Sequence, residues 1–107
     1  MDDAQLLKGV LEGCVLSIIS RGETYGYEIL GVLQDSGFDN LIEGTLYPVL
    51  TRLQKKNLIA CRVGKSPLGP SRKYFSITPE GEQYLAEFIG NYSKVTEAAM
   101  KILSKRE

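Results

Sequence analysis

The sequence predicts a mostly helical α+β domain, and three observations support this prediction. Apolar residues recur at helical spacing in four segments of the chain. An extended pattern lies between the third and the fourth of these segments. The chain has 107 residues, 43% apolar and 24% charged, which is typical of one globular domain with a single core.

Two helices are predicted in the first third of the chain. The first ends near Arg21-Gly22 and carries a wide apolar stripe, which consists of Leu6, Leu7, Val10, Leu11, Cys14, Val15, Ile18 and Ile19. The second is capped by Thr24 and stops at Ser36-Gly37. Its inward-facing residues are Ile29, Leu30 and Leu33. Because Cys14 belongs to the stripe, we expect its thiol to lie in the core.

A third helix is predicted between Asp39 and Asn57, with Gly44 and Thr45 at its start. Its apolar residues are spaced by three and four positions: Leu46, Val49, Leu50 and Leu53. This spacing directs basic side chains outward, namely Arg52, Lys55 and Lys56. Pro48 is tolerated because it lies within the first turn.

The helical period gives way to an extended one after Asn57. One predicted strand contains Leu58, Ile59, Cys61 and Val63, and a second contains Tyr74, Phe75 and Ile77. Residues 65–71, which separate them, are dense in turn formers, so we predict a two-stranded hairpin with a mobile basic tip. Since side chains alternate between the two faces of a strand, either Tyr74 or Phe75 is expected in the core.

A final helix is predicted from Thr78-Pro79-Glu80, which supplies an N-cap, a first-turn proline and an acid, to about Ser104. A helix of about 25 residues is about 37 Å long, so we expect its distal half to pack outside the monomer. Residues at heptad spacing would form a dimer seam: Leu85, Phe88, Tyr92, Val95, Ala99 and Ile102. We therefore divide the chain into a domain at 1–77 and a dimerisation helix at 78–107.

The aromatic residues of this last helix allow two interpretations. Tyr84, Phe88 and Tyr92 follow one another at four-residue steps. They either fill the dimer seam or line a cavity for a planar apolar effector.

Charge is distributed unevenly along the chain, although the formal net charge is zero. Residues 1–43 hold eight acids and two bases (−6), residues 44–77 seven bases and no acid (+7), and residues 78–107 four bases and five acids (−1). The basic segment is a candidate surface for a large anion such as nucleic acid. The alternative is that acidic side chains from elsewhere in the chain fold over these bases.

Composition argues against an enzyme or a metal site. The chain has no histidine, and two cysteines, Cys14 and Cys61, cannot complete a four-ligand zinc site. No pair of nucleophile and base can be assembled, so neither catalytic residues nor cofactors are expected. Met1-Asp2-Asp3 does not resemble a signal peptide and no apolar run is long enough to span a membrane, so we expect a cytoplasmic protein. A redox role for either cysteine stays open.

The predicted order of three helices, a hairpin and a long helix is that of a winged helix-turn-helix with a C-terminal extension. Three segments, Tyr25–Ile29, Glu43–Leu50 and Gly69–Phe75, resemble the PadR family of bacterial transcriptional regulators. The resemblance implies a homodimeric repressor whose C-terminal helices form the dimer, in some members around a pore that binds aromatic molecules. Members that bind flat drugs have a tryptophan at the dimer centre, and this sequence contains none.

DNA contacts are expected from the third helix and the hairpin. Gly44 and Thr45 begin the helix, where unpaired amides can meet a phosphate. Its outward residues are Tyr47, Thr51, Arg52 and Lys55, and the hairpin adds Lys65, Arg72 and Lys73 to neutralise phosphates. We expect a palindromic operator, released when an effector changes the spacing of the two recognition helices.

Several of these residues have an alternative role in which they do not contact DNA. Arg52 and Lys55 could form ion pairs with the acidic first third instead of contacting DNA. Tyr25 and Tyr27 could be packing residues or DNA contacts. A different class of function, a winged helix that docks a partner protein without DNA affinity, would require an apolar surface on the third helix.

Overall fold

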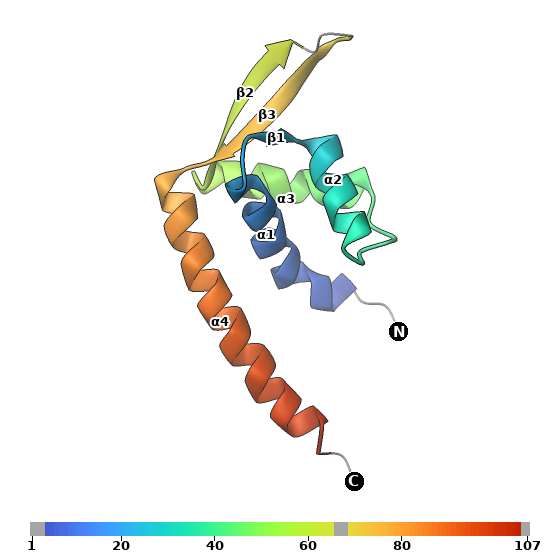
Figure 1. The fold of residues 1–107 in the computed structure, drawn as a ribbon, viewed down its shortest axis with the longest axis vertical. Helices are drawn as coiled ribbons and strands as arrows, with labels where there is room; N and C mark the ends of the chain where they lie inside the picture. Colours follow the sequence, from blue (N-terminus) through green and yellow to red (C-terminus); the bar gives the residue numbers. More distant parts are fainter. Residues whose placement is uncertain (1–3, 66–68, 106–107) are drawn as a thin grey trace.

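The computed structural model describes residues 4–65 and 69–105 and has the predicted winged-helix architecture (Figure 1). The elements in chain order are α1 (Ala4–Ser20), β1 (Thr24–Tyr25), α2 (Gly26–Asp35), α3 (Glu43–Lys55), β2 (Ile59–Lys65), β3 (Ser71–Ile77) and α4 (Pro79–Leu103). The strands form an antiparallel sheet in the order β1-β3-β2. None of the helices in the described ranges is long and apolar enough to cross a membrane.

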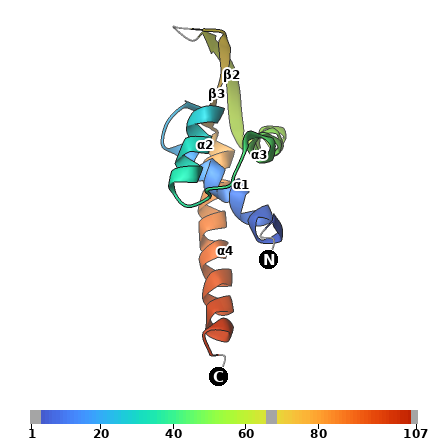
Figure 2. The ribbon, with the colours of Figure 1, turned by 90° about the vertical axis from the view of Figure 1, so that its right-hand side faces the viewer.

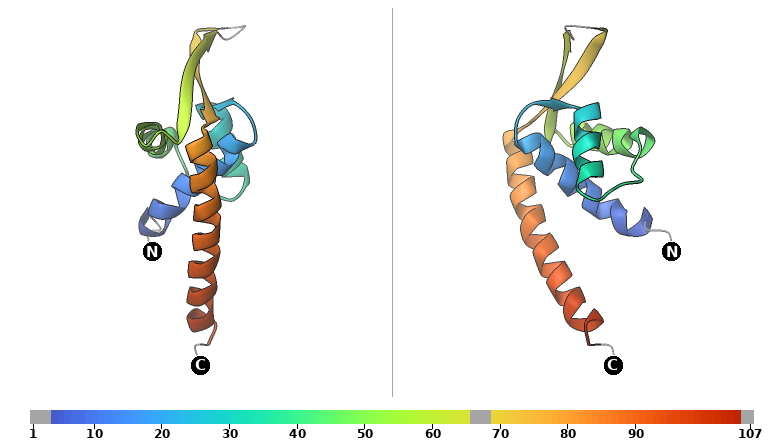
Figure 3. Two further views of the ribbon diagram at one scale, coloured as in Figure 1. Left: turned by 90° about the vertical axis from the view of Figure 1, so that its left-hand side faces the viewer. Right: turned by 45° about the vertical axis from the view of Figure 1, so that its right-hand side comes forward.

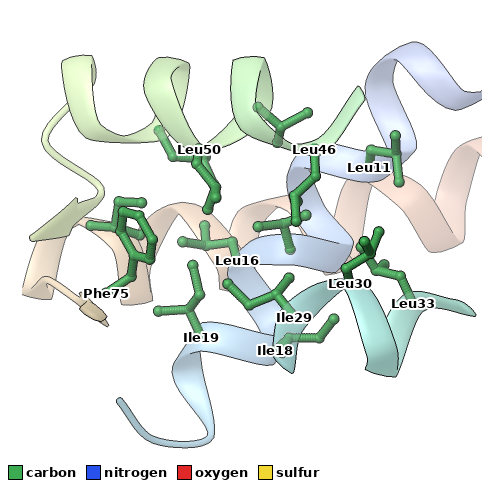
Figure 4. Close-up of a cluster of buried hydrophobic side chains, with 14 of the residues drawn as sticks. Leu11, Leu16, Ile18, Ile19, Ile29, Leu30, Leu33, Leu46, Leu50 and Phe75 are labelled. Atoms are coloured by element: carbon green, nitrogen blue, oxygen red, sulfur yellow. The ribbon is translucent and has the colours of Figure 1, made fainter. Parts of the chain in front are cut away.

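The core lies where α1 passes between the other elements, since α1 contacts α2, α3, α4 and β3. Figure 4 shows side chains from α1, α2 and α3 pointing toward one another, with Phe75 of β3 closing one side. The fully buried side chains are Val15, Leu16, Ile19, Ile29, Leu33, Leu46, Leu53 and Ile59. Burial of each such side chain contributes about 1.5–3 kcal/mol, so this layer holds α3 and the sheet in fixed positions.

Helix boundaries follow the glycine signals of the sequence. After α1 ends at Ser20, Gly22 has a φ of 148°, and after α2 ends at Asp35, Gly37 has a φ of 124°. A residue without a Cβ atom adopts these angles at little cost. The predicted stops at Arg21-Gly22 and Ser36-Gly37 are thereby confirmed.

The prediction that Thr24 caps the second helix is wrong. The N-cap of α2 is Tyr25, which makes no side-chain cap hydrogen bond. Thr24 is buried in β1, opposite Phe75 of β3, and its hydroxyl donates to the carboxylate of Glu28. Backbone pairing with β3 thus keeps Thr24 extended. It also adds a third strand to the predicted two-stranded sheet.

The wing consists of β2 and β3, paired from Ile59–Ile77 to Lys65–Ser71. Phe75 is buried while Tyr74 lies on the opposite face and is half-buried, which confirms that one of the two belongs to the core. The turn predicted at 65–71 lies partly outside the described residues, and so does its predicted mobility.

Helix α4 begins as predicted. The hydroxyl of Thr78 accepts a hydrogen bond from the amide of Gly81 (3.0 Å), and Pro79 occupies the first helical position. Gly81 lies so close to the neighbouring chain that a Cβ atom there would be 2.1 Å from the carbonyl oxygen of Leu58. Helices α1 and α4 lie side by side near the start of α4 and diverge toward its C-terminal end (Figures 1 and 3). The molecule is therefore elongated, with extents of 58 × 30 × 20 Å.

Candidate nucleic-acid interface

Helix α3 presents a polar face on the side away from the core. Its buried residues are Leu46, Val49, Leu50 and Leu53. With 100° between successive residues, Gly44, Thr51 and Lys55 lie opposite this apolar row, and all three are exposed. Figure 2 shows α3 at the side of the molecule, beside the wing and free of covering elements. These three residues are thus placed where the sequence predicts a DNA-reading surface.

The start of α3 differs from the expectation in two respects. The helix begins at Glu43, so Pro48 is its sixth residue and lies inside the helix, not within the first turn as predicted. The amide of Thr45 donates to the carbonyl oxygen of Ile42 (3.1 Å), so it does not stay unpaired for a phosphate. Ile42, the N-cap residue, makes no side-chain cap hydrogen bond. The tightened turn satisfies the amide instead.

The flank of α3 that faces α1 is held by one carboxylate. Oε1 of Glu12 accepts hydrogen bonds from Lys56 (3.0 Å) and from the hydroxyl of Tyr84 (2.8 Å), and Oε2 lies 3.6 Å from Nε of Arg52. The Glu12 side chain is only 13% exposed. Burial raises the pKa of the Glu12 carboxyl, but the hydrogen bonds from Tyr84 and Lys56 and the positive charges of Lys56 and Arg52 together outweigh it, and the net pKa lies below the ordinary value.

Glu12 therefore joins α1 to α3 and α4 at once. The ion pair weighed against DNA contact for Arg52 is formed, and its partner belongs to the acidic first third of the chain. Lys55, the other residue for which this alternative was open, is exposed and forms no ion pair within the described ranges.

The basic segment 44–77 thus separates into two groups. Three bases face carboxylates of the acidic first third: Arg52 and Lys56 contact Glu12, and Arg62 contacts Glu23. The other four form no ion pair in the part of the chain that is described: Lys55, Lys65, Arg72 and Lys73. They lie on the outward face of α3 and on the wing. Within the segment 44–77, folding therefore leaves the unpaired bases on these two elements.

Alternating basic and aromatic side chains line one face of the sheet. Arg62 donates two hydrogen bonds to Glu23, both of 2.7 Å, and its guanidinium lies 4.7 Å from the ring centre of Tyr74. The Tyr74 ring meets Tyr25 edge to face at 5.9 Å. The guanidinium of Arg72 lies 4.2 Å from the ring centre of Tyr25. Cation–π contacts of this kind fix the direction of a long arginine side chain.

A cavity of about 570 Å³ opens between the wing, the start of α2 and α3. Its lining residues are Tyr25, Gly26, Tyr27, Tyr47, Ser71, Arg72, Lys73 and Phe75. The hydroxyl of Tyr47 reaches it because Gly26 has no side chain: a Cβ atom on Gly26 would lie 2.8 Å from that oxygen. Each of the three segments that carry the family resemblance contributes to the lining. Folding thus brings together motifs whose first residues are 18 or more positions apart in the sequence.

The predicted seam residues of α4 separate into two environments. Leu85 is buried (8% exposed), and the hydroxyl of Tyr84 donates a hydrogen bond to Glu12. The ring of Phe88 packs against Gly13 of α1, so closely that a Cβ atom added to Gly13 would lie 2.1 Å from the ring. Beyond Phe88, the apolar residues are exposed, up to 77% for Ile102. We call Tyr92, Val95, Ala99 and Ile102 the distal stripe, flanked by the exposed Ile89, Met100 and Leu103. Tyr92 stacks on Phe88 with 5.8 Å between ring centres.

Both cysteines carry free thiols and are half-buried. Burial raises the pKa of the Cys14 thiol, which disfavours the reactive thiolate. In residues 4–65 and 69–105, no three histidine, cysteine or acidic side chains are grouped so that they could hold a metal ion.

The sequence analysis did not assign the roles that two residues of this region have in the structure. Glu12 has no sequence signal beyond being a charged residue inside an otherwise apolar stripe. Tyr25 was left open between packing and DNA contact, and its stack with Arg72 depends on the strand β1 that the sequence did not predict.

Comparison with known proteins agrees with this geometry. The family model described as the transcriptional regulator PadR-like family matches residues 15–87. The crystal structure of a PadR-like transcriptional regulator from Bacillus cereus is 45% identical, with a TM-score of 0.84 over 97% of this chain and 100% of that one. A Streptococcus transcriptional regulator is 44% identical, with a TM-score of 0.82 over 92% of this chain and 97% of that one.

Curated relatives extend the comparison. Uncharacterized protein X of Lysinibacillus sphaericus is 33% identical over 88% of both chains. The transcriptional regulator YqjI of Escherichia coli is 31% identical over 74% of this chain, a match that spans 37% of YqjI. The winged-helix fold, the matched family model and these relatives together show that the chain belongs to the PadR-like family of transcriptional regulators.

Proposed function

We propose that the chain is a repressor that binds a palindromic operator as a homodimer. The outward face of α3, with Gly44, Thr51 and Lys55, enters the major groove, and the wing follows the adjacent backbone. The observation that carries this proposal is the separation of charge within the basic segment 44–77: its four bases without a carboxylate partner in the described structure lie on these two elements.

Further contacts follow from the same arrangement. Tyr47 lies at the cavity between α3 and the wing, and Lys65, Arg72 and Lys73 supply phosphate contacts from the wing. Thr45 and Arg52 lie on the flank toward α1, where Arg52 would have to leave Glu12 to reach a phosphate.

The proposal is tested by gel-shift titration against the DNA upstream of the protein's own gene. Binding should weaken steeply with salt, because each phosphate contact releases counterions. Lys55→Ala should weaken binding and lower the salt slope by about one. Lys56→Ala is the matched control, since Glu12 already holds this lysine. Absence of binding at low salt would reject the proposal.

Dimer formation is assigned to the distal stripe of α4. Its four residues and their three apolar neighbours are exposed in the single chain, and heptad spacing lets two such helices interlock. A dimer would set two α3 helices about one turn of DNA apart, which a palindrome requires.

Release of DNA is assigned to a planar aromatic effector at the α4 pair. Tyr84 and Phe88 are engaged inside the protomer, so the effector would bind at the exposed Tyr92. A planar dye should quench tyrosine fluorescence of the dimer, and Tyr92→Ala should abolish the quenching. Equal quenching in both proteins would remove this part of the proposal.

The protein-docking alternative has less support, because the residues of α3 opposite its core face are Gly44, Pro48, Thr51 and Lys55, which do not form the apolar surface that this alternative requires. As a DNA-binding regulator the protein would act in the cytoplasm.

A further inference from the structure

Two arginines of the sheet each place their guanidinium group over a tyrosine ring, but only one of the two guanidinium groups is also bonded to a carboxylate. Arg62 stacks on Tyr74 and Arg72 on Tyr25, at 4.7 and 4.2 Å from the ring centres. The guanidinium of Arg62 is occupied by Glu23 through two hydrogen bonds. Arg72 has no carboxylate partner in the described ranges. An oriented guanidinium with no anion of its own is suited to one supplied by a ligand.

The surroundings of Arg72 favour a phosphate diester as that ligand. No acidic residue lines the cavity of about 570 Å³ beside it. Besides Arg72, the side chains with polar groups that line it are Lys73, Ser71, Tyr25, Tyr27 and Tyr47. Cations and hydroxyls are the groups that usually contact DNA phosphates.

Tyr25 sets the direction of Arg72. Strand pairing places Tyr25 opposite Tyr74, and the edge-to-face contact of their rings, with 74° between planes, fixes the Tyr25 ring. Stacking on this ring restricts Arg72 before any ligand binds, which lowers the entropy lost on binding.

We propose that Tyr25 is a positioning residue that holds the Arg72 guanidinium at this cavity, and that the cavity takes one backbone phosphate of duplex DNA. The inference rests on the proposed DNA binding. To the proposed DNA binding, the inference adds a defined phosphate site and the residue, Tyr25, that orients Arg72 at this site.

The test uses the whole protein and a fluorescent mixed-sequence duplex of about 30 base pairs, since a phosphate contact does not depend on sequence. Anisotropy is measured over a range of salt. Arg72→Ala should weaken binding roughly tenfold and lower the salt slope by about one. Tyr25→Leu should weaken it about two- to fivefold, while Tyr25→Phe, which keeps the ring, should lose clearly less affinity than Tyr25→Leu. Lys94→Ala, on exposed α4, controls for loss of a distant charge.

Combining Tyr25→Leu with Arg72→Ala tests whether Tyr25 acts on DNA affinity through Arg72. In the Arg72→Ala background, Tyr25→Leu should have no further effect on affinity. An equal effect in both backgrounds, or an equal loss in Tyr25→Phe and Tyr25→Leu, would overturn the inference. If thermal unfolding shows that Tyr25→Leu is not folded, Arg72→Lys provides the test. This variant keeps the positive charge but loses the planar group that stacks on Tyr25. Wild-type affinity of Arg72→Lys would overturn the inference. Absence of salt-sensitive binding by the wild type would instead reject the proposed function.

Discussion

The two halves of α4 carry the same apolar spacing, yet they have opposite environments. In the half that begins at Pro79, Gly81 and Leu85 are buried, and Tyr84 and Phe88 are engaged by α1. In the half that ends at Leu103, the distal stripe is exposed. The difference arises because α1 diverges from α4 (Figure 1). A heptad pattern therefore shows that a helix has an apolar side, but not whether its partner belongs to the same chain.

The largest effect that would sharpen this comparison is expected from two glycines of α4. Gly81→Ala should lower the free energy of unfolding by about 3 kcal/mol or more, because the new Cβ atom would meet the backbone oxygen of Leu58. Gly90→Ala is the matched change in the exposed half, where nothing lies within 4 Å of the added atom. It should stabilise the helix by about 0.5–1 kcal/mol. Urea unfolding measures both, and equal effects would contradict the packing difference.

Leucine truncation tests the buried half alone. Leu85→Ala should cost about 2–5 kcal/mol of unfolding free energy, because the side chain is 8% exposed and its removal leaves a cavity. Leu103→Ala, which truncates the same side chain at a position 60% exposed, should have a much smaller effect on the single chain. Thermal unfolding at low protein concentration measures the pair. A similar loss in both would show that the exposed half is buried as well.

Introducing a charge tests the exposed half. Val95→Glu should weaken self-association at least about 100-fold, because a carboxylate within an apolar interface would be left unpaired. Ser93→Glu adds the same charge on the opposite side of α4 and should leave association unchanged. Sedimentation equilibrium gives the dissociation constants. An unchanged dimer in Val95→Glu would place the interface elsewhere.

The smallest effect is expected at Glu12, where the buried half of α4 meets α3. The folded pKa of Glu12 lies below its ordinary value of 4.5, so between the two pKa values the unfolded chain binds more protons. The stability that Glu12 contributes is therefore complete above pH 4.5 and is lost as the pH falls through the folded pKa. Tyr84→Phe, which removes one hydrogen bond, should cost about 1 kcal/mol at neutral pH and reduce this acid sensitivity.

Glu12→Gln provides the control for that titration. It keeps the shape of the side chain but has no carboxyl to protonate, so its unfolding free energy should fall less steeply with acid than that of the wild type. Parallel pH profiles for the two proteins, measured by urea unfolding, would show that Glu12 does not carry the effect.

Local sequence signals predicted the boundaries of most elements well. The cap and proline at Thr78-Pro79 start α4, and Ser36-Gly37 ends α2, as expected. These signals act within one turn of backbone, so their physics is contained in a few neighbouring residues. Thr24 failed the same reasoning, because its partner Phe75 is about 50 residues away and a two-residue strand has no period of its own.

The candidate site was predictable in part. The sequence located the excess of positive charge in 44–77 and identified the residues that could contact DNA. It left open whether acids cover them, since ion pairing depends on distances between segments. The structure shows that Glu12 and Glu23 neutralise one group of bases and leave the other.

By itself, the sequence determined the order of helices and strands, the apolar side of each, and the segment that holds the positive charge, because spacing and composition act locally. Only the tertiary structure decided which bases of the segment 44–77 are paired with carboxylates, which half of α4 is buried, and that Tyr25, Tyr47 and Arg72 share one cavity. Each of these depends on contacts between residues distant in the chain, and such contacts exist only once α1 has brought the other elements together.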